Sequence, residues 1–540
     1  MTNALPNEIY SNILSFATHD TALTSRLASK HLCSIATPQA VEHIWLEASY
    51  DVSGFINIAK TPHLRAHVRE VTIETVVRDY DYFCNNSFKP PAAFFRALPY
   101  LRLFSGLKRL NIRFEKHCGN EDADYSGQSI EEKYEFRRWV LWSVFSCVSG
   151  DWDVERYQEL YEDTNHDLYE NGEVIDNDDF FNELTRETKL IGEMPPITLD
   201  ALSIAHLADY YDTEFYHANV FQKVMASPTL KKLELYIVTE QCPAAPENAT
   251  WFPEKWDFFE SLKDTWLTPE VAKRLEVLSL FCDDLWGWCP MMDLREINSD
   301  AGPNSGFPRL KVLALGNYVF SHEWQMDWFS RLGLQNGYSG LQKLYLDYCP
   351  IMFGFMNFGP VDERPGTAGY PLKEVAIGNL QGYSAGVSRS LRMRWHHVLD
   401  HWKENMRGLR TLRIGQGAWE GELSQIAWDG IRETFPDAPD GVLTRLFHRL
   451  DGTNFRTYHC PSLPPADEKP EDATTYISGS GIRELEHEVM EYVHFDAGLG
   501  PSPWQEPELK DERAPEFLQI PKELDLQALE ELRAVIQERN

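Results

Sequence analysis

Three side chains in the C-terminal half of this sequence have the spacing of a metal site. His397, Asp400 and His401 are three and four residues apart, so on a helix they would share one face. Imidazole and carboxylate groups are common zinc ligands, but no further ligand of suitable type follows at a telling distance. Trp395 and Trp402 are interleaved with the three. The pattern therefore favours an outer helix with packed aromatics over a metal site.

A second candidate lies in a stretch dense in carboxylates, residues 151–184. Part of an EF-hand loop pattern occurs there, at Asp167, Asn171, Gly172, Val174 and Asp178. Position three of that pattern is Tyr169, which is not an oxygen donor of the required kind, the last ligand is Asp rather than Glu, and no paired hand follows. We interpret the stretch as a solvated acidic loop.

Motifs for catalysis are missing from the sequence. It contains no glycine-rich phosphate loop, no G-x-S-x-G and no H-E-x-x-H. Its nine cysteines include no C-x-x-C pair. We therefore expect no enzyme activity and no cofactor.

The net charge and the hydropathy of the chain limit the kinds of partner that it is expected to bind. The formal charge is -32, from 51 Lys+Arg against 83 Asp+Glu, and such a surface repels phosphate backbones, so nucleic acid is not expected. The start, MTNALPNEIY, lacks the pattern of a secretory signal. The longest apolar run, 139–148, is about half a membrane span. We expect no membrane association, reduced thiols and a cytoplasmic or nuclear location.

The elements that would position any site come from a recurring segment. The segment has six residues: Leu, then Lys, Arg, Glu or Gln, then any residue, then Leu, any residue and Leu, where another aliphatic residue can replace either of the last two leucines. It occurs at 107–112, 230–235, 275–280, 310–315, 341–346, 372–377 and 409–414. About one such match is expected by chance, so chance does not explain seven. Looser relatives occur at 41–46, 68–73 and 199–204.

Each copy predicts a short strand. Its fourth and sixth residues point to one face, and stacked parallel copies can share one core. Helix-period segments such as 324–334 and 391–406 lie between the copies. The pattern resembles leucine-rich repeats over about 41–415, although the later intervals, between the copies that begin at 230, 275, 310, 341, 372 and 409, are 31 to 45 residues long and exceed the usual ~20–29. The resemblance implies an α/β fold: an irregular solenoid with parallel strands on the concave side and helices outside.

Two regions interrupt or follow the repeats. An insertion at about 118–196 begins with a helix-like stretch at 131–148 and continues into the acidic segment. Residues 416–540 form a C-terminal cap with an acidic, Pro-rich part at 461–475. The final residues 521–540 predict an amphipathic helix, which would either cover the last strand or swing free.

Residues 1–40 follow a different pattern. Pro6 suits a first helical turn, and apolar positions predict three short helices, the third ended by Pro38. The opening Leu5-Pro6-x-Glu8-Ile9, the Ile13-Leu14 pair and SKHLCSIATP resemble the F-box, which binds the Skp-family adaptor of cullin-based (SCF) ubiquitin ligases. The resemblance implies adaptor contacts through Leu5, Pro6, Ile9, Ile13, Leu14, Leu23, Leu27 and Ile35. These helices could also, or instead, cap the first strand.

The residues that flank each inward Leu pair would line the concave face. We expect a target protein to bind there, through Arg109, Arg113, Lys232, Tyr236, Lys343, Tyr345, Asp347 and Arg413. A basic, Tyr-bearing strip on an acidic chain fits an acidic or phosphorylated degron, although Lys and Arg are also ordinary solvated strand residues. With the F-box, this implies an SCF substrate receptor that reaches a cullin through the adaptor. The alternative is a scaffold without a role in ubiquitylation.

Overall fold

The structure is a computed structural model. It describes residues 6–15, 19–48, 51–75, 90–114, 134–164, 166–170, 172–238, 253–299, 306–347, 349–357, 361–373, 387–417, 482–483, 490, 492–496, 500–501 and 521–540. The chain divides into two compact units. The first comprises 1–115, 131–205 and 214–230, and the second comprises 116–130, 206–213 and 231–540.

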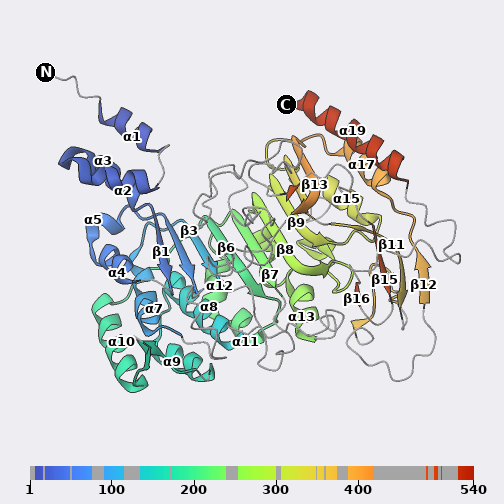
Figure 1. Ribbon diagram of the computed structural model, residues 1–540. Coiled ribbons are helices and arrows are strands. Elements are labelled where there is room, and N and C mark those ends of the chain that lie inside the picture. The colour runs from blue at the N-terminus through green and yellow to red at the C-terminus, as the bar shows by residue number, and fades with distance from the viewer. Residues whose placement is uncertain are drawn as a thin grey trace, which may run out of the picture. The chain divides into compact units, whose positions relative to one another are not determined.

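The first unit begins with three short helices, α1 (Asn7–Ser15), α2 (His19–Ala28) and α3 (Lys30–Ala40) (Figure 1). The three predicted helices are confirmed, but Pro38 does not end the third, which continues to Ala40. A proline in the last turn of a helix removes only one late backbone bond. The N–H of Val41 still bonds to Thr37 O at 3.1 Å, so the final turn closes around Pro38.

Four parallel strands form the sheet of the first unit, in the order β1 (His43–Glu47), β2 (Glu70–Glu74), β3 (Arg109–Arg113) and β6 (Ala201–Ala208). They arise from the segments at 41, 68, 107 and 199. Equivalent positions of each segment lie opposite one another, so Leu110 is aligned with Val71 and Leu202. Leu110 and Ile112 are fully buried. Alternation along each segment thus separates an apolar face from a polar face.

Helices cover the apolar face of these strands. They are α4 (Ser53–Lys60), α5 (Pro62–Arg65), α7 (Ala92–Ala97), the 3-10 helix η1 (Leu98–Leu103), α8 (Tyr134–Ser149), α11 (Thr213–His217) and α12 (Asn219–Met225). Phe95 stacks on Trp139 with ring centroids 3.8 Å apart. Phe145 stacks on Phe221 at 5.9 Å. The aromatic helix predicted at 131–148 is confirmed as α8 and forms the centre of this core.

The prediction of a solvated loop at 151–184 is wrong. This segment forms α9 (Val154–Asp163), a small hairpin of β4 (Tyr169–Glu170) and β5 (Glu173–Val174), and α10 (Asn177–Ile191). Apolar residues at helical spacing are buried among the carboxylates, namely Tyr157, Leu160, Tyr161, Phe180, Phe181 and Leu184. Asp153 and Asp176 cap the two helices through their side chains. Burial of the apolar stripe on each helix, together with the side-chain caps, stabilises the two helices more than repulsion among the carboxylates destabilises them.

The second unit contains the later repeats. Its main sheet runs β7 (Lys232–Val238), β8 (Val277–Trp286), β9 (Val312–Tyr318), β10 (Lys343–Asp347) and β13 (Thr411–Gly417), all parallel, followed by antiparallel β14 (Ile482–Arg483). The segment 372–377 lies almost wholly outside the described residues, and β10 pairs directly with β13. The predicted α/β class and parallel strands are confirmed.

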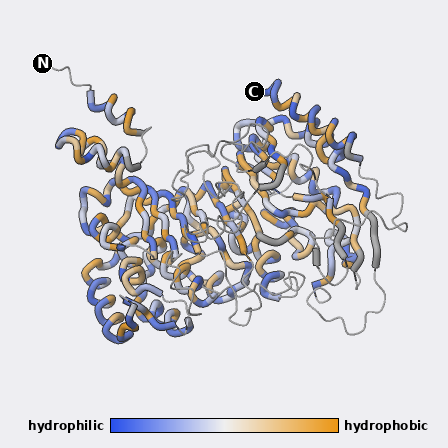
Figure 2. Tube along the Cα trace, viewed as in Figure 1, coloured by the Kyte–Doolittle hydropathy of each residue, from blue (hydrophilic) through white to orange (hydrophobic). Residues whose placement is uncertain are grey.

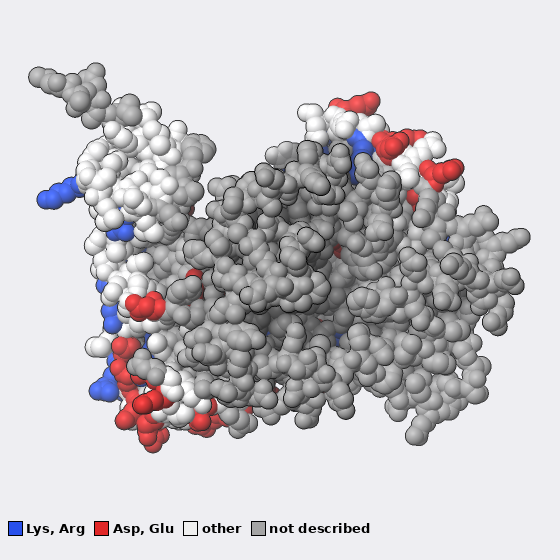
Figure 3. Space-filling view, viewed as in Figure 1, with Lys and Arg blue, Asp and Glu red and all other residues white. Residues whose placement is uncertain are grey.

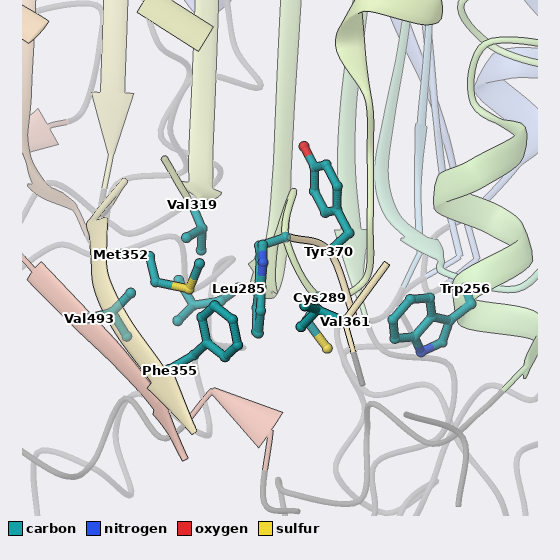
Figure 4. Close-up of a cluster of buried hydrophobic side chains, with 10 residues drawn as sticks. Trp256, Leu285, Cys289, Val319, Met352, Phe355, Val361, Tyr370 and Val493 are labelled. Atoms are coloured by element: carbon teal, nitrogen blue, oxygen red, sulfur yellow. The ribbon is translucent and has the colours of Figure 1, made fainter. Parts of the chain in front are cut away.

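A second sheet packs beside this one, in the order β12 (Val387–Ser390), β11 (Ile351–Asn357), β15 (Tyr492–Asp496) and β16 (Gly500–Pro501). Its apolar side chains join a buried cluster with Trp288 and Cys289 of the loop after β8 and Trp256 of α13 (Pro253–Ser261). Figure 4 shows Met352, Phe355 and Val493 converging on this cluster. Segments far apart in sequence therefore share one core.

The remaining helices of the second unit are α14 (Pro269–Ala272), the 3-10 helix η4 (Leu294–Glu296), α15 (Trp324–Ser330), α17 (Trp395–Asn405) and α19 (Lys522–Arg539). The helices predicted at 324–334 and 391–406 are thus confirmed. The final helix does not swing free, because Leu529 and Leu532 are buried and Lys403 of α17 pairs with Glu531 at 2.7 Å.

Candidate docking surface on the N-terminal helices

Four aliphatic side chains of α1 and α2 are exposed. The exposed fractions are 44% for Ile9, 55% for Ile13, 38% for Leu23 and 87% for Leu27. Ile9 and Ile13 are four residues apart on α1, as are Leu23 and Leu27 on α2, so each pair shares one helix face. The other six exposed large hydrophobic side chains of the described residues are spread over β5, α10, residues 334–338 and α19. A group of this kind on short helices is typical of a protein-docking surface.

The other predicted docking residues divide between the surface and the helix interior. Pro6 is exposed beside Ile9, and Ile35 of α3 is half-buried. Leu14 is buried together with Ala22 and Ala36, so it helps to hold the helices together. Leu5 lies outside the described residues.

Local contacts fix α3 relative to its neighbours. Ser29 is the single residue between α2 and α3, and its Oγ accepts a hydrogen bond from Leu32 N at 3.1 Å. Gln39 Nε2 donates to Ser11 Oγ of α1 at 3.2 Å. Only Val41 and Glu42 separate α3 from β1. Capping and the short link therefore set the helices at the first strand of the unit.

The N-terminal helices differ in charge from the rest of this acidic chain. Residues 1–40 contain two acidic residues, Glu8 and Asp20, and two basic residues, Arg26 and Lys30. In Figure 2 hydrophobic and hydrophilic residues alternate along these helices. Figure 3 shows a largely uncharged surface there, whereas acidic side chains gather over α9 and α10. The docking surface is thus apolar and close to neutral.

The polar face of the first sheet carries a network that the sequence did not reveal. Asn111 Nδ2 donates to Glu70 Oε1 at 3.0 Å and to Thr72 Oγ1 at 3.1 Å, and His43 Nε2 lies 2.8 Å from Thr72 Oγ1. Parallel register brings these residues together, because it places Thr72 between Trp45 and Asn111. The only available signal was that Asn111 belongs to the recurring segment at 107–112 and that His43, Glu70 and Thr72 belong to its looser relatives at 41 and 68.

The predicted target-binding residues lie on the polar faces of the two sheets. Arg109, Lys232, Lys343 and Arg413 are half-buried, whereas Arg113, Tyr236, Tyr345 and Asp347 are buried. The chemical character of the polar face changes from strand to strand. Phe281 and Tyr236 pack edge to face on adjacent strands with centroids 4.8 Å apart, and Phe281 contacts Gly316 of the next strand. The face therefore has an aromatic part on β7–β9 and a basic part on β10 and β13.

The two metal candidates have other roles where the structure describes them. His401 Nε2 lies 3.3 Å from Asp327 of α15, and Asp400 pairs with Lys403 at 2.7 Å. Asp167 and Asp178 are exposed on either side of the β4–β5 hairpin. Within the described ranges, no group of three His, Cys, Asp or Glu side chains is placed to hold a metal ion.

Comparison with known proteins adds no family to this picture. No protein-family model matches the chain, and no curated protein sequence matches it. In the part of the chain that the structure describes, no helix is both long and apolar enough to span a membrane.

Proposed function

We propose that this protein is the substrate-recognition subunit of an SCF-type ubiquitin ligase. Helices α1–α3 would be its F-box and would bind a Skp-family adaptor, which connects to a cullin. The parallel strands and their helices would form the leucine-rich-repeat part, which holds a target protein. In this proposal the chain contributes no catalytic group of its own.

The exposed aliphatic surface of α1 and α2 supports the proposal most directly. Ile9, Ile13, Leu23 and Leu27 are four of the eight positions that the F-box resemblance assigns to the adaptor, and all four face solvent. Moving such a side chain out of water stabilises a complex by about 1.5–3 kcal/mol. Left uncovered, four of them on short helices would favour aggregation. A permanent partner explains why they are retained.

The regular register of the strands supports the repeat part of the proposal. Nine of the ten predicted segments become strands, and each described neighbour pairs in parallel at equivalent positions. Within each unit, such repetition produces a face on which side chains can be varied independently of the core. That property suits the recognition of a particular target.

The contribution to the reaction would be positioning. Isopeptide transfer needs a target lysine held near a charged thioester that the partner complex supplies. A receptor with two docking surfaces raises the effective concentration of the lysine at that thioester. The chain needs two binding surfaces for this role, and a nucleophile is not required.

Reconstitution tests the proposal. The full chain is co-expressed with a Skp-type adaptor and purified through a tag on the adaptor, and the expected result is a complex of equal stoichiometry. Proteins captured by the chain are then incubated with the cullin, the ubiquitin-charging enzymes and ubiquitin. Ubiquitylation of a captured protein supports the receptor role. An adaptor complex that captures proteins without modifying them indicates a scaffold, and failure to bind the adaptor overturns the proposal.

A further inference from the structure

We propose that the second unit carries a docking surface for an acidic segment of a partner protein, at the edge where β9, β10 and β13 begin. This surface, the basic patch, consists of Leu334, Tyr338, Arg407, Arg410 and Arg539. Asp or Glu carboxylates of the segment would bind the arginines, and an apolar side chain of the segment would pack on Leu334 and Tyr338. The inference goes beyond the proposed function and does not depend on adaptor binding.

The residues that precede β9, β10 and β13 lie side by side. Gln342 N donates to Lys311 O at 2.8 Å, and Arg410 N donates to Gln342 O at 2.7 Å. Gly408 is in the turn between α17 and β13, and a Cβ at this position would lie 2.9 Å from the backbone oxygen of Tyr338. The backbone of Tyr338 therefore lies directly against the turn that ends at Arg410.

The two apolar side chains of the basic patch belong to a loop that internal hydrogen bonds hold in place. Leu334 is 44% exposed and Tyr338 is 59% exposed. Between them, Asn336 donates through Nδ2 to Leu310 O at 2.8 Å and accepts from Tyr338 N through Oδ1 at 2.7 Å. The first of these bonds ties the loop to the segment before β9. Both side chains are thus presented to solvent on a fixed backbone, which lowers the entropy cost of binding.

Three guanidinium groups meet at the ends of α17 and α19 (Figure 1). Arg407 and Arg410 are exposed, and Arg539 is half-buried. Arg539 donates to Met406 O at 2.7 Å and to Lys403 O at 3.2 Å, so its position is fixed. Burial lowers the pKa of Arg539, and the positive charges of Arg410 and Arg407 lower it further. The three cations are therefore within electrostatic reach of one another, and a bound anion would relieve their repulsion.

Nearby carboxylates do not neutralise the two exposed arginines. Among the described residues, neither of these arginines takes part in an ion pair. Glu404 of α17 and Glu538 of α19 are exposed on the same helices. Lys311 Nζ lies 5.9 Å from the centroid of the Tyr338 ring, but it pairs with Glu276 at 2.6 Å. We therefore leave Lys311 out of the basic patch, because its charge is already compensated.

An acidic peptide segment fits these groups better than other anions. A carboxylate can bind a guanidinium through two parallel hydrogen bonds, and three guanidinium groups can hold more than one carboxylate. The exposed Leu334 and Tyr338 add an apolar contact that a nucleic-acid backbone would leave uncovered. The net charge of -32 also repels extended polyanions. A short segment is affected less, because charges more than about 8 Å away are largely screened at physiological salt.

Three fluorescent peptides test the basic patch on the full-length chain. The first has glutamates on both sides of a central Leu-Phe pair, the second has Gln in place of every Glu, and the third has Ser-Ser in place of Leu-Phe. By fluorescence anisotropy, the first should bind about tenfold more tightly than the second and about threefold more tightly than the third. Equal binding of the first two peptides, or binding of neither, overturns the proposal. Equal binding of the first and third removes the apolar contact from it.

Substitutions locate the site. The double variant Arg407→Gln, Arg410→Gln should weaken binding of the first peptide about tenfold, because two charge-assisted contacts are lost. Arg407→Lys, Arg410→Lys keeps both charges and should bind within about threefold of wild type. Thermal unfolding of both variants should match wild type, since the two exposed side chains have no ion-pair partner among the described residues.

The matched control is Arg186→Gln on α10, which removes an exposed arginine from the first unit. It should change peptide binding by less than about twofold. An effect as large as that of the double Gln variant would show that net charge alone governs binding, and would refute the site.

Two further measurements examine other occupants. Vesicles of phosphatidylcholine and phosphatidylserine should not bind the wild-type chain more tightly than the double Gln variant. A difference for vesicles but not for the first peptide would assign the basic patch to a membrane. Sedimentation should give the same mass for both chains. A wild-type dimer that the double Gln variant dissociates, without peptide binding, would assign the basic patch to a second copy. Either result overturns the proposal.

Failure of this proposal is distinguishable from failure of the proposed function. The double Gln variant should bind a Skp-type adaptor as wild type does, since Arg407 and Arg410 are outside the N-terminal helices. A chain that binds the acidic peptide but no adaptor retains the basic patch and loses the ligase role. A chain that binds the adaptor but not the acidic peptide loses only the basic patch.

Discussion

Asp525 of α19 accepts two hydrogen bonds from His396, one from the backbone N–H at 2.9 Å and one from ring Nδ1 at 2.7 Å. Its second oxygen accepts from the Tyr492 hydroxyl at 2.6 Å, and that hydroxyl in turn accepts from Trp395 N at 3.0 Å. Trp395 and His396 are the first residues of α17. The exposed N–H groups at the start of this helix are thus satisfied by residues about a hundred positions away in sequence.

The other end of α17 is covered in the same way. Arg539 donates to Met406 O at 2.7 Å and to Lys403 O at 3.2 Å. A carboxylate at the N-terminus and a guanidinium at the C-terminus both complement the helix dipole of α17. The C-terminal helix therefore belongs to the folded core of the second unit.

Replacement of Asp525 should destabilise the second unit. Asp525→Ala removes an acceptor from three donors in a site where the side chain is 3% exposed, and we expect the free energy of unfolding to fall by about 2–4 kcal/mol. Urea denaturation measures this change. Glu523→Ala, an exposed position in the same turn, is the control and should change stability by less than about 0.5 kcal/mol. Equal stability of the two variants would show that α19 does not hold α17.

A close contact on the polar face of the second sheet gives another prediction. Phe281 packs so closely on Gly316 that a Cβ at Gly316 would overlap its ring. Gly316→Ala should therefore lower stability by about 1–3 kcal/mol. Gly54→Ala in α4, where no atom lies within 4 Å of the added Cβ, should instead raise stability by up to about 1 kcal/mol. Thermal denaturation of both variants checks the opposite signs.

Stability should depend on pH through His322. Its ring stacks on Tyr370 with centroids 4.3 Å apart, and Nε2 lies 3.0 Å from Ala368 O. Burial is the main reason that the pKa of His322 is lowered below 6.5, and the nearby Arg295 lowers it further. Because the folded pKa is below the unfolded pKa, stability is complete above about pH 6.5 and is lost as pH falls toward the folded pKa.

The comparison between pH 7.5 and pH 5.5 measures this effect. The free energy of unfolding of the wild-type chain should be lower at pH 5.5, and His322→Gln should show a smaller difference between the two pH values. If the variant keeps the full difference, other groups cause the pH dependence.

The strands could be predicted from sequence because each one repeats the same local pattern. Leu110 and Ile112 alternate with polar residues, and a recurring segment of this kind has few ways to bury its face other than parallel stacking. The exposed faces of α1 and α2 followed from the spacing of Ile9, Ile13, Leu23 and Leu27 in the same way.

The features that could not be predicted from the sequence are the burial within α9 and α10 and the contacts between residues that are distant in sequence. In α9 and α10 the carboxylates obscured buried residues such as Tyr157 and Phe181, whose helical spacing was present in the sequence. The network that joins Asn111 to Glu70 and Thr72 depends on which strands are neighbours. No single segment contains that information. The capping of α17 by Asp525 has the same origin, since it joins residues brought together only by the complete fold.

Adaptor binding by surface variants is the most direct test of the central proposal. The double variant Ile13→Asp, Leu27→Asp places two charges on side chains that are 55% and 87% exposed, so the fold should be retained. The control is Leu190→Asp on α10, which is also 87% exposed but lies outside the docking surface. With a purified Skp-type adaptor and isothermal titration calorimetry, we predict that the wild-type and Leu190→Asp chains bind with equal affinity. The double variant should bind at least a hundredfold more weakly. Equal binding by the double variant would contradict the assignment of α1–α3 as the adaptor-docking element.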